Sequence, residues 1–336
     1  MNTNNFGIYA NAASIWVVSD GTRGMEVQSI GLAERMGFNP TIFRLKPPSF
    51  IRHFPRFAKT GVYPIPAPLA SSIKKDGWPD VIITTGRRMA GLSILLRKKS
   101  KGRSRTIHIQ DPKLSPSLFD HLIIPSHDKL RADNVILSLG SLSPLTSQVI
   151  SERAKLLPSD ITNLPHPRIA VMVGGSNRRY AVNETDFIRL GQYLNALGHA
   201  TDGSLIIIPS RRSHDEAAPI IAAQMGVDLL TTPDFWVWDG VSENPYPGIL
   251  DAVDAVVVTA DSVNMTCEAC SSGKPVYRYD FKQEKGRIAL FHRMMEEAGF
   301  TNPFEPIDAS SFPGSAPPHL DETGRIADCL MGRSSS

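Results

Sequence analysis

Cysteine is scarce in this sequence and long apolar runs are missing, which excludes several classes of protein. The three cysteines among 336 residues, Cys267, Cys270 and Cys329, are too few for a disulfide framework. No run of about 18 apolar residues could span a bilayer, and the N-terminus lacks the basic start and apolar run of a signal peptide. We therefore expect a reduced, cytoplasmic protein that is neither secreted nor integral to a membrane.

Patterns for metal and cofactor binding are equally scarce. The sequence has no DxD carboxylate pair and no His and Glu residues at metal-site spacing, and no second pair of cysteines accompanies Cys267 and Cys270. The turn SDGTRGME after the first expected strand differs from the GxGxxG turn of a dinucleotide site. We therefore expect no metal and no cofactor, so that helix N-termini and arginines would neutralise an anionic ligand.

The net charge of +3 conceals an uneven distribution along the chain. Residues 1–165 contain 22 Lys and Arg against 11 Asp and Glu, a net charge of +11. Residues 166–336 contain 14 against 22, a net charge of −8. A basic first half favours an anionic partner such as lipid head groups, nucleic acid or a polyanionic acceptor. Pairing of the two halves with each other across a cleft is the alternative.

Strands alternate with helices along the chain, which predicts parallel, doubly wound sheets. In the first half, a strand at 14–21 precedes an amphipathic helix at 25–37, and a second strand follows at 40–45. The pattern restarts at residue 168, after a proline-rich linker at 156–167. We expect an α/β protein with two Rossmann-like domains that face a cleft.

The chain is too long for one domain of roughly 100 to 200 residues, so we divide it into two domains and a tail. Residues 1–160 form the expected N-terminal domain on the acceptor or membrane side. Residues 161–310 form the expected nucleotide-binding domain. Residues 311–336 form a tail that can pack back on the N-terminal domain.

Three strand ends in the second half carry chemistry that suits phosphate. A glycine turn follows one strand, an arginine pair follows the next, and a hydroxyl-rich turn begins a helix after the third. Ligands of open parallel sheets bind outside the carboxyl ends of the strands, so we expect these turns to converge on one nucleotide-diphosphate site. The candidate residues are Gly174, Gly175, Ser176, Arg178, Arg211, Arg212, Thr259, Asp261, Ser262 and Asn264.

Each of these signals also has a purely structural interpretation. A glycine turn often only connects a strand to a helix, and arginines at a strand end often form surface ion pairs. Asp261 or Ser262 can simply cap the helix that follows. Trp238 and Asp239 could wall a base pocket, although aromatic residues at alternating positions are also typical of a strand core. The sequence leaves these alternatives open.

Polar residues at strand ends of the first half are candidates for catalysis. Asp20 follows the first strand and is the best candidate for a general base, although capping of the next helix is an equal alternative. Asp111 and His127 follow later strands. A proton shared between His127 and Asp128 is less favoured, because adjacent residues in a loop usually point apart.

Several segments together resemble a known family. They are SDGTRGMEVQSIGLAERMG, the GGSNRRY and PSRRS loops, VWDGVSENPYPGILDAVDAVVVTADSVNMTCEA and SGKPVY. Over residues 14–282 they resemble the bacterial branch of the mitochondrial-fission "elongated mitochondria" family. The resemblance implies the GT-B glycosyltransferase architecture, and bacterial members are often labelled nucleoside-diphosphate-sugar epimerases.

More remotely, residues 255–280 are similar to the donor-site element of GT-B enzymes. In those enzymes a turn begins a helix that holds the donor diphosphate, and a Glu in the first turns of the helix binds ribose hydroxyls. The resemblance places Glu268 in that position. Many transferases have Gly where this chain has Asp261, and a carboxylate repels a diphosphate unless an arginine or a metal compensates its charge.

A proline-rich segment at 47–68 brings aromatic and basic residues together. Three phenylalanines lie among Arg, His and Lys residues at 50–59, and residues 97–105 add six positive charges. This combination suits an anionic membrane surface, where each cation contributes roughly 1 kcal/mol. No DNA- or RNA-binding module accompanies these charges, so we expect no nucleic-acid partner.

The leading hypothesis is a metal-independent, GT-B-type glycosyltransferase. Its C-terminal domain would bind a nucleotide-sugar linked to UDP or GDP, and its N-terminal domain would bind a membrane-associated or anionic acceptor. The alternatives are a non-catalytic scaffold associated with membranes and a nucleoside-diphosphate-sugar epimerase. The expected location is the cytoplasm, with peripheral binding to the inner face of the membrane as part of the hypothesis. The sequence leaves open whether the protein is an enzyme.

Overall fold

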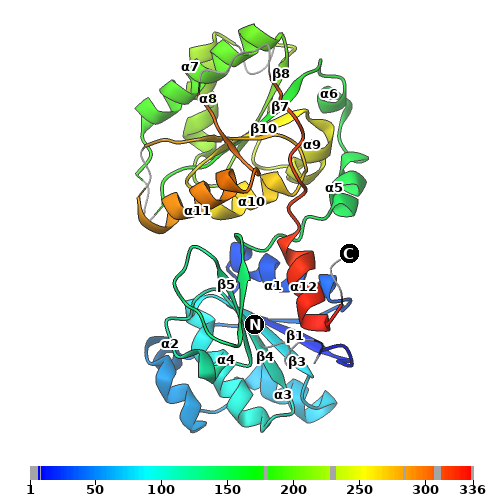
Figure 1. Ribbon diagram of the computed structural model, residues 1–336, viewed down its shortest axis with the longest axis vertical. Coiled ribbons are helices and arrows are strands. Elements are labelled where there is room, and N and C mark those ends of the chain that lie inside the picture. Colours follow the sequence, from blue (N-terminus) through cyan, green and yellow to red (C-terminus); the bar gives the residue numbers. More distant parts are fainter. Residues whose placement is uncertain are drawn as a thin grey trace. The chain divides into compact units, whose positions relative to one another are not determined.

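The computed structural model describes residues 7, 9–177, 181–227, 232–282, 285–305 and 312–333. The chain forms two compact units, the first comprising Met1–Pro144 with Asp321–Ser336 and the second comprising Leu145–Leu320 (Figure 1). Each unit contains a six-stranded sheet in which neighbouring strands run parallel. The expected pair of Rossmann-like parallel sheets is confirmed.

The first sheet has the strand order β2-β1-β3-β4-β5-β6. Its inner strands are buried on both faces, as is usual for a parallel sheet with helices on both sides. The strands are β1 (Ile15–Ser19), β2 (Thr41–Arg44), β3 (Val81–Thr85), β4 (Arg105–Ile109), β5 (His121–Pro125) and β6 (Val135–Ser138).

Successive residues of β1 face two separate cores, because side chains alternate along a strand. Val17 packs with Leu32 and Leu330 on one face, and Val18 packs with Leu95 on the other. Figure 1 shows α1 and α12 close together, on the side of the first core. The helices are α1 (Arg23–Arg35), α2 (Ser49–His53), η2 (Pro55–Thr60), α3 (Ala67–Asp76), α4 (Arg87–Ser100), η3 (Pro116–Leu118) and α12 (Glu322–Met331).

The second sheet has the strand order β12-β11-β10-β7-β8-β9. Its strands are β7 (Arg168–Val173), β8 (Ser204–Pro209), β9 (Phe235–Val237), β10 (Ala255–Thr259), β11 (Val276–Tyr279) and β12 (Asn302–Pro303). Its helices are α5 (Ser147–Ala154), α6 (Ser159–Thr162), α7 (Glu184–Thr201), α8 (His214–Met225), α9 (Tyr246–Ala252), α10 (Val263–Cys270) and α11 (Gly286–Glu297). The adjacent strands β10, β7 and β8 occupy the middle of this sheet. Because they run parallel, the loops that follow them lie together at the carboxyl edge of the sheet.

The two units divide earlier than residue 160, where we expected the boundary. The second unit begins at Leu145 because α5 packs against α9. The contact is close: a Cβ atom on Gly248 would lie 2.6 Å from the carbonyl oxygen of Arg153. Arg153 also forms an ion pair with Glu243 at 2.8 Å. The segment before the linker therefore belongs to the second unit.

The C-terminal part of the chain is also divided differently from the expected tail at 311–336. The second unit extends to Leu320, and the chain then returns to the first unit. There the Asp321 side chain caps α12 and forms an ion pair with Arg35 of α1. None of the helices that the structure describes combines the length and apolar character that a bilayer crossing requires.

Candidate functional site

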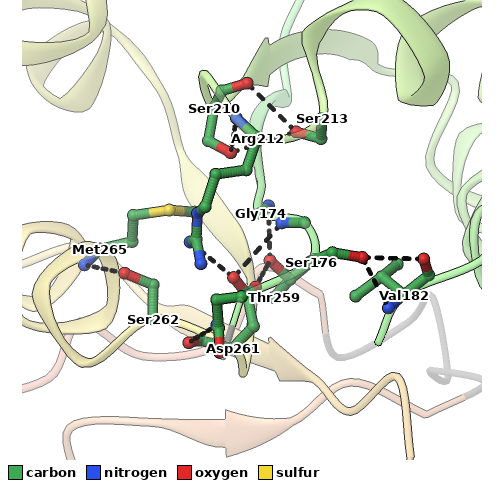
Figure 2. Close-up of polar contacts among 12 residues, drawn as sticks. Gly174, Ser176, Val182, Ser210, Arg212, Ser213, Thr259, Asp261, Ser262 and Met265 are labelled. Carbon is green, nitrogen blue, oxygen red and sulfur yellow. Dashed lines mark hydrogen bonds and ion pairs between the residues drawn. The ribbon is translucent and has the colours of Figure 1, made fainter. Parts of the chain in front are cut away.

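Asp261 lies where the loops after β7, β8 and β10 meet (Figure 2). Its side chain is fully buried, and its Oδ2 atom accepts a hydrogen bond from Nη2 of Arg212 at 2.7 Å. The Thr259 hydroxyl donates to Oδ1 at 2.7 Å, and the Gly175 N–H donates to Oδ2 at 3.3 Å. The Gly174 N–H in turn donates to the Thr259 hydroxyl oxygen at 2.7 Å. One carboxylate thus joins three strand-end loops.

Glycine is required at 174 and 175 because other groups approach the backbone closely. A Cβ atom on Gly174 would lie 2.0 Å from Oδ1 of Asp261. A Cβ atom on Gly175 would lie 2.5 Å from the carbonyl oxygen of Arg212. Both distances are far below van der Waals contact, so this glycine turn makes room for the protein's own groups.

The charge of Asp261 is balanced within the protein. Burial is the largest influence and raises the pKa of this carboxyl, whereas the Thr259 hydrogen bond and the charge of Arg212 lower it. The net shift is upward. Arg212 is therefore the compensating cation that a carboxylate near a diphosphate needs. Because Arg212 is paired with Asp261, the other arginine of this turn, the exposed Arg211, is the better candidate to contact an anionic ligand.

Helix α10 begins directly beside this junction. The Ser262 side chain caps the helix by accepting a hydrogen bond from the Met265 N–H at 3.4 Å (Figure 2). Asn264 and Glu268 lie on the same helix and are partly buried. The structure thus gives Ser262 a capping role, and the remaining first-turn N–H groups of α10 form the positive end of the helix dipole.

The rest of the glycine loop is closed on itself. The Ser176 hydroxyl donates to the Val182 carbonyl oxygen at 3.0 Å and accepts from the Val182 N–H at 3.0 Å (Figure 2). The Asn177 side chain donates to the backbone carbonyl oxygen of Asp261 at 3.2 Å, which ties this loop to the β10 turn. Arg178 lies outside the described residues.

Trp238 and Asp239 follow β9 at the same edge of the sheet. The Trp238 indole N–H donates to the Ser242 hydroxyl at 3.2 Å, and its side chain is nearly buried. Oδ1 of Asp239 accepts hydrogen bonds from the N–H groups of Val241 and Ser242 at 2.9 and 2.8 Å. These bonds fold a tight turn. A role in base binding stays a prediction.

The strand order brings the three catalytic candidates of the first unit to one sheet edge, since β1, β4 and β5 end on the same side. Asp20 accepts a hydrogen bond from the Thr22 N–H at 3.0 Å and lies 3.6 Å from Nη1 of Arg88. Burial tends to raise the pKa of Asp20, but these hydrogen bonds and the Arg88 charge outweigh it, so the pKa is lowered. A lowered pKa makes Asp20 a weaker base.

Asp111 is also engaged locally. It is nearly buried, accepts a hydrogen bond from the Lys113 N–H at 2.7 Å, and forms an ion pair with the Lys113 ammonium. His127 is partly buried in the turn after β5. The roles of Asp20, Asp111 and His127 in catalysis stay predictions.

The sequence reasoning missed a pocket beside the same turn. Residues of β11, its following turn and α11 line a pocket of about 680 Å³, among them Arg278, Asp280, His292 and Arg293. His292 is buried, and its Nε2 atom lies 2.8 Å from the Ala260 carbonyl oxygen, so α11 contacts the turn that holds Asp261. The available signal was Arg278, a charged residue inside the otherwise apolar and aromatic strand VYRY. Across the described ranges, no three His, Cys, Asp or Glu residues gather to hold a metal ion.

Two Rossmann-like units with polar strand-end loops define a protein of GT-B architecture. One solved structure of this fold is UDP-GlcNAc 2-epimerase from Neisseria meningitidis bound to UDP-GlcNAc, with a TM-score of 0.56, 14% identity, and coverage of 95% of this chain and 99% of that chain. Another is a complex of a UDP-glucosyltransferase from Polygonum tinctorium, with a TM-score of 0.52, 12% identity, and coverage of 96% and 93%. At such identities the likeness concerns the fold.

The chain belongs to the mitochondrial fission ELM1 family, which matches residues 23–333. Mitochondrial fission protein ELM1 of Arabidopsis thaliana is 30% identical over 279 residues, covering 76% of this chain and 63% of the relative. The uncharacterized protein RP120 of Rickettsia prowazekii is 29% identical over 317 residues, covering 82% and 87%. The family resemblance is confirmed, and the chain spans less than two thirds of the Arabidopsis relative.

Proposed function

We propose that this protein binds a nucleoside-diphosphate sugar at the carboxyl edge of the second sheet. The observation that carries the proposal is the joining of three strand-end loops through Asp261, directly beside the start of α10. Such edges are where open parallel sheets bind ligands. A helix N-terminus attracts the negative charge of a diphosphate.

The charges at this edge favour an anion once Asp261 is balanced. Arg212 neutralises the buried carboxylate, so the exposed Arg211 and the first turn of α10 supply the positive potential. In the proposed pose, the diphosphate contacts Ser262 and the α10 N-terminus, and Glu268 accepts hydrogen bonds from the ribose. Trp238 lies at the same edge, in the loop after β9, as a candidate for contact with the base.

The comparisons support a uridine nucleotide as the first ligand to test. The Neisseria structure is described as bound to UDP-GlcNAc, and the Polygonum protein as a UDP-glucosyltransferase. Both share the fold of this chain at low sequence identity. Binding of UDP or a UDP-sugar by this chain is our proposal.

Titration calorimetry of the full chain with UDP, GDP and their sugars tests the proposal. We expect saturable binding of at least one nucleotide. Glu268→Gln should weaken that nucleotide about tenfold or more and leave free pyrophosphate unchanged, because only the nucleotide carries a ribose. Arg211→Ala should weaken both ligands. A folded chain that binds none of the nucleotides would contradict the proposal.

A binding protein without turnover is the second candidate function. The lowered pKa of Asp20 and the engagement of Asp111 by Lys113 favour it, because a general base needs a free carboxylate with a pKa near the working pH. Incubation of the chain with a bound nucleotide-sugar distinguishes the two. Release of free nucleoside diphosphate, or a changed sugar, indicates an enzyme; unchanged ligand with lipid and glycan acceptors present indicates a binding protein.

We also propose that the partner of the first unit is anionic. No acidic residue occurs between Glu34 and Asp76, and none between Asp80 and Asp111. These two stretches carry most of the positive charge of the first unit. A polyanion or a membrane-bound acceptor with a phosphate group fits such a surface.

A further inference from the structure

Three phenylalanines are exposed beside one another, one in α2, one in η2 and one between these two helices. Phe50, Phe54 and Phe57 are 44%, 55% and 54% exposed. The Phe50 ring lies 5.0 Å from that of Phe54 and 5.8 Å from that of Phe57, measured between centroids. Exposed aromatic rings scattered singly are ordinary, but a contiguous cluster marks an interaction surface.

A buried anchor on the opposite side holds these rings in place. Ile51 and Ala58 are fully buried and pack in the core with α4. A Cβ atom on Gly91 of α4 would lie 2.4 Å from Cγ2 of Ile51 and 3.2 Å from Cβ of Pro55. This close contact fixes α2 and η2 on α4, which lies beside α2 in Figure 1. The rings are therefore presented by a packed element.

Unbalanced cations surround the rings. Arg52, Arg56 and Lys59 are exposed and form no ion pair with any described residue. Lys98 of α4 joins them, because its Cγ atom lies 3.2 Å from where a Cβ on Gly61 would be. Arg97 differs, since it pairs with Asp120 at 2.9 Å. Of the basic segment at 97–105, the structure thus places Lys98 beside the cations of 50–59.

We propose that this aromatic–basic face, Phe50, Phe54 and Phe57 with Arg52, Arg56, Lys59 and Lys98, docks on an anionic lipid bilayer and inserts its rings among the head groups. The inference deepens, and rests on, the proposed anionic partner of the first unit. Cations gain from the negative surface potential while apolar rings leave water. An anionic partner alone would not require exposed phenylalanines, and an apolar partner alone would not require the cations around them.

The ring geometry favours a bilayer over a nucleic acid. Bases stack on open aromatic faces. The Phe50 ring instead stacks with Tyr63 at 5.2 Å with an interplanar angle of 27°, and Phe54 and Phe57 meet edge to face at 73°. These rings pack on one another at different angles and do not form parallel platforms for stacked bases, which suits the irregular apolar environment of lipid.

Flotation of the full chain with vesicles tests the proposal. We expect binding to an equimolar mixture of phosphatidylcholine and phosphatidylglycerol, none to phosphatidylcholine alone, and weaker binding at high salt. Arg52→Gln with Arg56→Gln should weaken binding by about fivefold per cation. Lys155→Gln with Lys285→Gln removes the same charge from exposed sites of the second unit and should leave binding unchanged.

The phenylalanines separate insertion from simple charge attraction. Phe54→Ser with Phe57→Ser should weaken vesicle binding about tenfold or more and leave retention on heparin unchanged. Leu156→Ser with Val241→Ser, which alters exposed apolar residues of the second unit, is the matched control. Thermal unfolding of each variant verifies that it is folded.

The alternative outcomes overturn the proposal in distinguishable ways. Vesicle binding that is unchanged by the phenylalanine substitutions would overturn insertion while leaving the anionic partner in place. Binding of neither vesicles nor heparin would overturn both. A chain that self-associates through these rings, becomes monomeric on their substitution and ignores vesicles would show that a second copy covers the face.

Discussion

At the scale of single residues, Asp261 is the group on which the candidate site depends. A buried carboxylate is costly unless it is paired and hydrogen-bonded. Asp261 has both kinds of partner, in Arg212 and in the hydroxyl and N–H groups of two loops. Asp261 therefore holds the three loops together, and Arg212 balances its negative charge. A bound diphosphate would consequently lie beside an ion pair with little net charge.

Removal of Arg212 should destabilise the protein in a pH-dependent way. The folded-state pKa of Asp261 is raised, so stability from this group is greatest when it is protonated and is lost as pH rises through the folded pKa. Arg212→Ala raises that pKa further. We expect a loss of about 1 to 3 kcal/mol near pH 7 and less near pH 5, with some screening at this partly exposed arginine.

Urea unfolding at the two pH values measures this effect. The double variant Arg212→Ala with Asp261→Asn is the control, because it has no buried carboxylate that could be left unpaired. Near neutral pH its free energy of unfolding should be higher than that of Arg212→Ala. An equal loss at both pH values would show that Arg212 stabilises the site by packing alone.

Gly174 provides a second test at the residue scale. Gly174→Ala places a methyl group against the carboxylate of Asp261, which three partners hold in place, so we expect a loss of about 1 to 3 kcal/mol. Gly198→Ala, within α7 and with no atom within 4 Å of the new methyl, should gain about 0.5 to 1 kcal/mol. Urea unfolding measures the change in the free energy of unfolding for each variant. If the two changes have the same sign, the close approach of Asp261 to Gly174 does not constrain this position.

At the scale of elements, α10 combines a cap with a candidate ligand site. Ser262 caps α10, and Thr146 caps α5 in the same manner by accepting a hydrogen bond from the Val149 N–H at 3.1 Å. A cap contributes to helix stability wherever it lies. Only the cap beside Asp261 is placed to affect nucleotide binding.

Ser262→Ala and Thr146→Ala should therefore separate the two roles. We expect each to lower the free energy of unfolding by about 0.5 to 1 kcal/mol. Nucleotide affinity should fall about tenfold in Ser262→Ala and stay unchanged in Thr146→Ala. Calorimetric titration measures the affinities, and equal affinities in the two variants would reduce Ser262 to a cap.

Element types were predictable from the sequence where periodicity and apolar runs decide them. The strand AVVVT and the helix after it were expected and are present as β10 and α10. The partners of polar side chains were not predictable, because they depend on which loops the sheet order brings together. Arg212 was expected to face a phosphate, yet it pairs with Asp261, which lies 49 positions further along the chain.

At the scale of the whole molecule, the points at which the chain passes from one unit to the other were the least predictable feature. A tail that packs back on the N-terminal domain was expected from residue 311, whereas the second unit extends to Leu320. The segment after Leu320 has no strand pattern, and its contacts with α1, with β6 and with the core of the first sheet assign α12 to the first unit. The early boundary at Leu145 has the same origin, since α5 is placed by its packing on α9. Both depend on long-range contacts that local sequence does not encode.

Leu330 tests the assignment of α12. It is 1% exposed in a core with residues of β1 and α1, so Leu330→Ala should lower the stability of the first unit by about 2 to 5 kcal/mol. Leu156→Ala, at a site 72% exposed, should change stability by less than about 0.5 kcal/mol. Scanning calorimetry measures both, and a wild-type profile for Leu330→Ala would contradict the assignment.

The central claim is that a nucleoside diphosphate binds at the Asp261 junction. A crystal structure of the full chain with UDP tests it most directly. The account predicts the diphosphate against Ser262 and the first turn of α10, with the Arg212–Asp261 pair intact and the ribose at Glu268. A diphosphate held instead by Arg278 and Arg293 in the neighbouring pocket, or bound in the first unit, would contradict it.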